Sequence, residues 1–229
     1  METQVAGETV TSFPEHVLHE GVPGNYRMAA FSDGVFAIAI TLLVLGLEVP
    51  RSVPEGGLLA LAPEYLPKLA AHVVTFAILG IYWVGHHNMF IYIKRHDRAL
   101  LWLNNLFLLF VAAMPFPTAL IVQYGNDRLA VIVYGSTLLL AGLSLELIWR
   151  YATYRRRLVA DNLDPDLITF VHRRVLLAPL VYLLAIATSF VSIAAAKVLF
   201  LLVAVAYIVP NPLDDYHHRQ FREGTGTSE

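Results

Sequence analysis

The first long apolar run of the chain reads MAAFSDGVFAIAITLLVLGL from Met28 to Leu47. Only Ser32, Asp33 and Thr41 interrupt its apolar character. An α-helix needs about 20 such residues to cross a hydrocarbon core of about 30 Å, because each residue adds about 1.5 Å to its length. The run therefore predicts a transmembrane helix near the start of the chain.

The composition extends this prediction to the whole chain. Of its 229 residues 57% are hydrophobic and 15% are charged, whereas about a quarter are charged in typical soluble domains. The 16 Lys and Arg nearly balance the 18 Asp and Glu, so the basic excess that nucleic-acid binding requires is missing. The absence of Cys excludes a disulfide scaffold, a thiolate metal site and a cysteine nucleophile. We therefore expect a membrane protein with no nucleic-acid partner.

Three further apolar runs are long enough to cross a bilayer, and a final block of 35 residues suits two short helices. The three runs are Leu69–Ile93, Leu100–Val122 and Leu129–Trp149, and the final block, Val175–Val209, has a turn near Ser189–Ala194. Pro115 and Pro117 predict a bend late in the third helix. Together these runs predict an all-α membrane protein with six transmembrane helices per chain.

Polar segments flank this membrane region. We expect a polar N-terminal tail at 1–26, a six-helix transmembrane domain at 27–210 and a polar C-terminal tail at 211–229. If both termini are cytoplasmic, twelve of the 16 Lys and Arg lie on the cytoplasmic side; the other four are Arg51, Lys68, Arg128 and Lys197. This distribution follows the positive-inside rule and predicts a multi-pass protein with both termini in the cytoplasm.

Polar residues gather at one end of the first predicted helix. Arg27, Ser32 and Asp33 precede a nearly uninterrupted apolar run. An ionisable group inside or near a bilayer is costly, so it is expected to have a function or a partner. Asp33 either satisfies amide groups in the first turns of the helix and contacts Arg27, or contacts a permeating ion directly.

Further along this helix, Ile38, Leu42 and Leu45 recur at helical spacing, with the Thr41 hydroxyl beside them. Periodicity alone favours packing or lipid contact for such a stripe. The small residues Gly34, Ala37 and Thr41 would let another helix approach closely.

His72 and His86 are the histidines of interest in the second predicted helix. Their spacing would suit a bis-histidine haem site, but the third and fourth spans contain no matching histidine. A buried histidine hydrogen-bonded to Asn104 or Asn105 of the third helix is the favoured interpretation. Glu146 and Arg150 form an ordinary i, i+4 surface pair on the fourth helix.

The sequence contains no G-x-S-x-G, H-E-x-x-H, phosphate-loop or T-V-G-Y-G motif. We therefore expect no enzyme activity, no cofactor, no metal site and no re-entrant carbonyl filter.

The run RMAAFSDGVFAIAITLL, from Arg27 to Leu43, resembles the first-helix signature R-x-x-x-F-S-D of the transmembrane protein 175 family. That family comprises the endosomal and lysosomal potassium channels and their prokaryotic relatives. Further positions that look like the family's are Trp83, His86, Phe90, Asn104 and Pro115-Phe116-Pro117-Thr118.

The resemblance implies the prokaryotic form, in which each chain carries one six-helix repeat and four chains form a homotetramer in the bacterial inner membrane. The first helix of each chain then lines a central potassium-permeable pore. Ile38, Leu42 and Leu45 would form its hydrophobic constriction, with Thr41 as a hydroxyl layer implicated in selectivity. An interhelical polar network fixing the pore helix would consist of Arg27, Ser32, Asp33, Trp83, His86 and Asn104.

We therefore expect a potassium-selective cation channel whose partners are its own copies, the lipid bilayer and monovalent cations. A proton-conducting channel or secondary transporter that uses Asp33 and His86 is the first alternative. A haem-binding redox membrane protein is the second.

Overall fold

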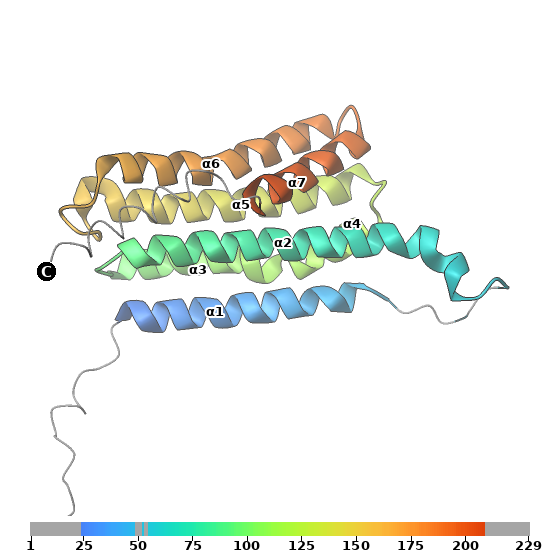
Figure 1. The fold of residues 1–229 in the computed structure, drawn as a ribbon, viewed down its shortest axis with the longest axis horizontal. Coiled ribbons are helices and arrows are strands. Elements are labelled where there is room, and N and C mark those ends of the chain that lie inside the picture. Colours follow the sequence, from blue (N-terminus) through green and yellow to red (C-terminus); the bar gives the residue numbers. More distant parts are fainter. Residues whose placement is uncertain (1–23, 49–51, 53–54, 209–229) are drawn as a thin grey trace, which may run out of the picture.

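The computed structural model describes residues 24–48, 52 and 55–208 (Figure 1). Within these residues the protein is built of helices, and the extended pairing is limited to one isolated bridge between Ile93 and Val159. The first helix begins at Gly24, three residues before the predicted start of the transmembrane domain at Arg27. The rest of that tail, at 1–23, and the predicted C-terminal tail at 211–229 lie outside the described residues.

Seven α-helices and three short 3₁₀ helices follow one another in the described residues. They are α1 (Gly24–Leu42), η2 (Leu43–Gly46), η3 (Leu58–Leu61), α2 (Ala62–Tyr92), α3 (Arg98–Ala113), α4 (Pro115–Gln123), α5 (Arg128–Thr153), η4 (Tyr154–Arg156), α6 (Pro165–Thr188) and α7 (Ile193–Ile208). Because α3 and α4 together make one span, five segments are long and apolar enough to cross a membrane. Five of the six predicted spans are thereby confirmed, and α7 is a shorter apolar helix of 16 residues.

The break between α3 and α4 lies where the prolines predict a bend. Pro115 has no amide hydrogen, so it cannot continue the α-helical ladder, and α4 starts at this residue. The Met114 amide instead donates to the carbonyl of Val111 at 3.2 Å. The Thr118 hydroxyl donates to the Met114 carbonyl at 2.7 Å. The carbonyls of Val111 and Met114 are thus partnered within the chain, as the bilayer requires.

Two predicted helix starts are wrong. Helix α6 begins at Pro165, about ten residues before the predicted Val175, because the Asp164 carboxylate accepts a hydrogen bond from the Asp166 amide at 2.9 Å. Helix α2 begins at Ala62 rather than near Leu69. Pro63 lies in its first turn, where backbone amides have no hydrogen-bond acceptor within the helix, so the missing amide hydrogen of proline does not disrupt it. The turn near Ser189–Ala194 is confirmed by the end of α6 at Thr188 and the start of α7 at Ile193.

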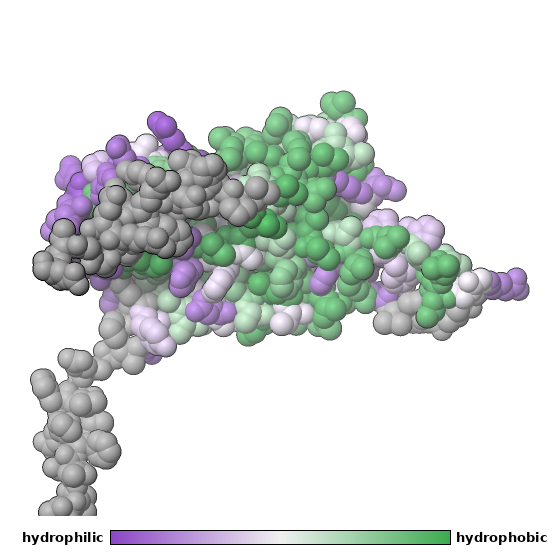
Figure 2. All heavy atoms as spheres, viewed as in Figure 1, coloured by the Kyte–Doolittle hydropathy of each residue, from purple (hydrophilic) through white to green (hydrophobic). Residues whose placement is uncertain are grey.

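The helices form a bundle in which α1 lies at one edge and α6 at the other (Figure 1). Helix α5 packs on α3, α4, α6 and α7, whereas α1 packs on α2, α3 and α4. In Figure 2 hydrophobic residues cover much of the bundle, and hydrophilic residues gather most densely at one end. We call this the basic end, because it carries Lys94, Arg95 and Arg155–Arg157 in the α2–α3 and α5–α6 connections.

Asp97 joins the two connections at the basic end. Its carboxylate caps α3 by accepting a hydrogen bond from the Leu100 amide at 2.9 Å. It also accepts one from the Tyr151 hydroxyl at 2.7 Å and lies 3.4 Å from Arg157 Nε. The hydrogen bond from Leu100, followed by that from Tyr151 and the charge of Arg157, holds the pKa of Asp97 below its ordinary value. Ionised Asp97 therefore ties α3 to α5.

We predict that Asp97→Ala lowers the free energy of unfolding by about 0.5–2 kcal/mol at neutral pH, because the α3 cap is lost. Asp97→Asn should retain part of the cap and lose the contribution of the charge. Since the pKa is lowered in the folded state, that contribution is present above the unfolded value of about 3.9 and disappears as the pH falls through the folded value.

Thermal unfolding of the detergent-purified protein between about pH 7 and pH 3 would measure this effect. The midpoints of the wild type and Asp97→Asn should differ near neutral pH and converge at the acidic limit. Asp161→Asn is the control, because Asp161 pairs with Arg95 on an exposed surface, where a salt bridge adds little. Equal midpoints of all three proteins at neutral pH would contradict this role of Asp97.

Candidate pore helix and its polar contacts

Helix α1 has one buried face and one exposed face. The buried face carries Met28, Ser32, Phe36, Ala39 and, in the following 3₁₀ turn, Leu43. This spacing places every one of these residues on a single side of the helix, where α2 and α3 pack. The remaining side faces away from the rest of the described chain.

The residues predicted to form the constriction lie on this exposed face. The exposed fractions of Ile38, Leu42 and Leu45 are 62%, 41% and 73%. Thr41 is exposed beside them, and its hydroxyl donates to the Ile38 carbonyl at 2.9 Å. The donated bond fixes the hydroxyl hydrogen on the helix and leaves the oxygen able to accept other contacts.

The ridge of small residues on α1 faces no other helix of the described chain. Gly34, Ala37 and Thr41 are all exposed. A Cβ placed on Gly34 would meet nothing within 4 Å. No other helix of the described chain therefore packs closely against these small residues.

A buried chain of hydrogen bonds connects α1, α3 and α2. The Ser32 hydroxyl donates to the Met28 carbonyl at 2.9 Å and accepts from Asn104 Nδ2 at 3.0 Å. Asn104 Oδ1 lies 2.9 Å from His86 Nε2. Because this amide oxygen can only accept, His86 donates and carries its proton on Nε2. Ser32, Asn104 and His86 are 0%, 1% and 2% exposed, so their polar groups depend on one another.

Aromatic rings enclose the imidazole of His86. The ring of Phe90 stacks on it at 4.2 Å between centroids, and that of Phe107 lies nearly parallel to it at 5.6 Å. Phe36 of α1 adds a tilted contact at 6.3 Å. These rings exclude water from the hydrogen bond between His86 and Asn104, which makes an unpaired partner there costly.

A second connection between α1 and α2 lies at the surface. The indole Nε1 of Trp83 donates to Asp33 Oδ1 at 2.8 Å, and its ring stacks on His87 at 5.6 Å. Arg27 is exposed and lines a hollow of about 470 Å³ with Phe31 and His96. Within the described residues Arg27 forms no ion pair with Asp33.

The structure thus brings five of the six residues of the predicted network into two sets of contacts. One set contains Ser32, Asn104 and His86, and the other contains Asp33 and Trp83. Asn104, and not Asn105, is the amide that bonds His86, because Asn105 lies exposed on the other side of α3. His72 has a buried Nδ1 atom that forms no hydrogen bond with the part of the chain that the structure describes.

Sequence reasoning missed one buried pair elsewhere in the bundle. Glu146 of α5 is buried and forms an ion pair with His172 Nδ1 of α6, so its interpretation as a surface partner of Arg150 is wrong. The available signal was a lone carboxylate within an apolar run. Its partner could not be recognised, because His172 falls in a segment that hydropathy assigns to a loop. The described residues hold no cluster of three or more His, Cys, Asp or Glu that could bind a metal ion.

The fold and these contacts define a multi-pass α-helical membrane protein whose first helix exposes an apolar face. Residues 27–115 match the family described as "Endosomal/lysosomal potassium channel TMEM175". A potassium channel of Streptomyces collinus is 41% identical over 170 residues, which cover 72% of this chain and 82% of that protein. The chain therefore belongs to the TMEM175 family.

A solved structure and an animal relative extend the comparison. The crystal structure of a lysosomal potassium-selective channel TMEM175 homologue from Chamaesiphon minutus superposes with a TM-score of 0.73 at 33% identity, covering 81% of this chain and 96% of that one. A human protein described as an endosomal/lysosomal proton channel is 32% identical over 161 residues, or 65% of this chain and 31% of that protein. Since the relatives are ion channels, the prediction that the chain is not an enzyme is confirmed.

We predict that Asn104→Ala lowers the free energy of unfolding by about 1–3 kcal/mol, because it leaves Ser32 and His86 without their buried partner. The adjacent Asn105→Ala is the matched control and should change stability little, since Asn105 is exposed. Thermal unfolding in detergent measures both variants. Equal midpoints of Asn104→Ala and Asn105→Ala would mean that the buried bonds do not hold α1 on α3.

Proposed function

We propose that the chain is one subunit of a homotetrameric, potassium-selective cation channel of a bacterial inner membrane. The first helices of four subunits surround the pore, and Ile38, Leu42 and Leu45 form its hydrophobic constriction. The bacterial relatives that cover most of this chain are named potassium channels, which supports potassium as the permeant ion. The proposed channel uses no cofactor, and potassium is its permeant ion.

The exposed face of α1 is the observation that carries this proposal. An apolar face at the edge of a bundle contacts either lipid or other copies of the chain. Lipid contact alone does not require the small residues Gly34 and Ala37 beside the large Ile38. Around a symmetry axis, small residues let four helices approach closely, and the large apolar side chains then meet in a ring. Such a ring can close a pore by expelling water.

The buried hydrogen bonds fix the rotation of α1 about its axis and so determine which side of the helix is exposed. Ser32 faces α3 when Ile38 faces outward, because the two residues are six positions apart on one helix. Rotating α1 by one residue position would remove Ser32 from Asn104. Each buried group left unpaired would then cost about 1–3 kcal/mol. The proposed role of Ser32, Asn104 and His86 is therefore to hold the pore helix in one rotation, with Asp33 and Trp83 adding a second tether.

Thr41 is the proposed hydroxyl layer of the pore. Its hydroxyl hydrogen is engaged with the Ile38 carbonyl, so its oxygen is the atom that can face the axis. Four such oxygens could replace part of the hydration shell of a potassium ion without a loop of backbone carbonyls.

The basic end is proposed to face the cytoplasm. The residues Lys94, Arg95 and Arg155–Arg157 lie in connections at this same end of the bundle, where Figure 2 shows hydrophilic residues gathered. Basic connections are retained in the cytoplasm during membrane insertion. Both chain termini would then be cytoplasmic.

We predict that the purified protein in liposomes carries potassium down a gradient without valinomycin. The flux should exceed that of sodium under the same gradient and should be absent from empty liposomes. A fluorescence assay of counter-ion movement measures both fluxes. Absence of potassium flux across a range of voltages and pH values would contradict the proposed function.

We predict that Ile38→Asn raises the single-channel conductance and lowers the preference for potassium over sodium, because an amide would hydrate the constriction. Leu180→Asn on α6 is the matched control, since Leu180 is 61% exposed, nearly as much as Ile38 at 62%. Recordings in planar bilayers compare the two variants. If Ile38→Asn and Leu180→Asn both kept the conductance and selectivity of the wild type, Ile38 would not line the constriction.

Proton conduction is the second candidate, because animal relatives are described as proton channels. The described contacts offer no simple relay from Asp33 to His86. Asp33 is bonded by the Trp83 indole, which can donate but cannot accept a proton. A current carried with protons as the sole permeant cation, and lost in Asp33→Asn, would favour this candidate. A potassium current that persists in Asp33→Asn would favour the potassium channel.

A further inference from the structure

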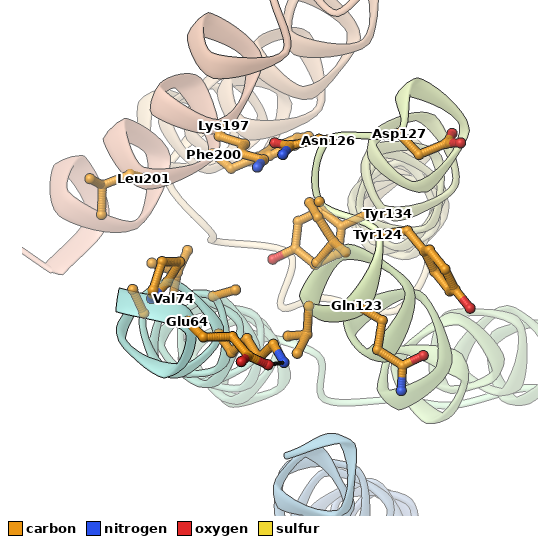
Figure 3. Close-up of a pocket in the computed structure, with 17 residues that line it drawn as sticks. Glu64, Val74, Gln123, Tyr124, Asn126, Asp127, Tyr134, Lys197, Phe200 and Leu201 are labelled. Atoms are coloured by element: carbon orange, nitrogen blue, oxygen red, sulfur yellow. Dashed lines mark hydrogen bonds and ion pairs between the residues drawn. The ribbon is translucent and has the colours of Figure 1, made fainter. Parts of the chain in front are cut away.

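A cavity of about 710 Å³, drawn in Figure 3, is lined by helix ends that lie opposite the basic end of the bundle in Figure 1. Its walls come from the first half of α2, the end of α4, the start of α5 and the first half of α7. The volume is within the range of about 300–1,000 Å³ that is usual for small-molecule sites. The contacts proposed above for α1 do not involve this cavity.

One positive charge in the cavity has no partner among the described residues. Lys68 is paired with Glu64 at 2.7 Å, and Asp127 caps α5 by accepting from the Leu129 amide at 2.7 Å. The ammonium group of Lys197 has no ion pair or hydrogen bond to another described residue. Figure 3 shows Lys197 beside Asn126, with Asp127 directed away from it. An unpaired ionisable group at a membrane helix calls for a ligand or a function.

Gly125 makes room for this ammonium group. A Cβ on Gly125 would lie 3.0 Å from Lys197 Nζ and 2.7 Å from the Ile121 carbonyl. The Asn126 side chain lies beside this ammonium group, whereas the side chains of Gln123 and Tyr124 line the cavity farther from Lys197 (Figure 3). This part therefore offers one positive charge beside a neutral amide, which suits a phosphate ester.

The rest of the cavity is apolar and continues toward the outer surface of the bundle. Its lining includes Val74 of α2 and Phe200 and Leu201 of α7, and Leu201 is exposed. Beside these lining residues, Val73 of α2 and Val205 of α7 are also exposed and apolar. Toward the floor, the hydroxyls of Thr75 and Tyr134 are paired with each other at 2.9 Å, so they need no ligand. A soluble anion would leave this apolar wall uncovered, whereas an acyl chain would cover it.

We infer that this cavity binds a phospholipid with an anionic headgroup from the adjacent leaflet. The lipid phosphate contacts Lys197 and Asn126, and an acyl chain runs along the apolar wall between α2 and α7. Phosphatidylglycerol, which carries one negative charge, matches the single unpaired ammonium. The choline of phosphatidylcholine would bring a second positive charge next to Lys197.

The test uses the full chain in detergent and measures lipid binding rather than ion flux, so its outcome is independent of the proposed channel function. Native mass spectrometry and thermal unfolding would follow titration with dioleoyl phosphatidylglycerol, dioleoyl phosphatidylcholine or glycerol 3-phosphate. Phosphatidylglycerol should bind saturably and raise the unfolding midpoint of the wild type. The other two probes should have little effect.

Lys197→Met should weaken phosphatidylglycerol binding by about tenfold, and Lys197→Arg should retain it. Lys94→Met is the matched control, because it removes the same charge at the basic end of the bundle. Ala70→Phe adds bulk to the cavity wall at an exposed position without changing any charge, and it should also weaken binding. Ala194→Phe, an exposed position outside the cavity lining, should not.

Several results would overturn the inference. One is equal binding of phosphatidylglycerol by the wild type and Lys197→Met. Another is equally tight binding of phosphatidylcholine, and a third is saturation of the site by glycerol 3-phosphate alone. If Lys197→Met does not fold, Ala70→Phe decides the question, and its unchanged binding would exclude a lipid in this cavity.

Discussion

The hydrogen bond from Asn104 to Ser32 determines which side of α1 remains uncovered. Helix α1 lies at the edge of the bundle and packs on α2, α3 and α4. Apolar packing alone specifies rotation weakly, since apolar residues occupy much of its circumference. The buried chain from Ser32 through Asn104 to His86 has one set of partners, and any other rotation leaves these groups unpaired. The exposed face of Ile38, Leu42 and Leu45 follows from that constraint.

The two ends of the bundle use charge differently. At the basic end, Asp97 accepts a hydrogen bond from Tyr151, pairs with Arg157 and caps α3, so its charge stabilises the connections between helices. At the opposite end, Lys197 remains without a partner among the described residues and lies in a cavity that is partly apolar. Charges at the basic end therefore serve the fold, whereas Lys197 is available for a ligand.

The sequence predicted the apolar helices and the polar residues of α1 better than it predicted helix starts. Hydropathy recognises residues that contact lipid, so it placed the start of α6 near Val175 and missed the polar turns from Pro165 onward. The burial of Glu146 against His172 was missed for the same reason. The sequence singled out Ser32 and favoured a bond from His86 to Asn104 or Asn105, but which atoms pair depends on helix rotation, which periodicity does not determine. The pairing of Asp33 with Trp83 rather than Arg27 likewise depends on the packing of α1 against α2.

In the proposed channel, Ile38 faces a water-filled pathway for potassium rather than lipid. The chain contains no Cys, so Ile38→Cys and Leu180→Cys each carry a single thiol. The decisive measurement is the potassium current of these variants before and after a positively charged methanethiosulfonate reagent, with mass spectrometry to establish that the thiol has reacted. A position of Ile38 in this pathway predicts that modification reduces the current through Ile38→Cys and leaves that through Leu180→Cys unchanged. An unchanged current through fully modified Ile38→Cys would contradict it.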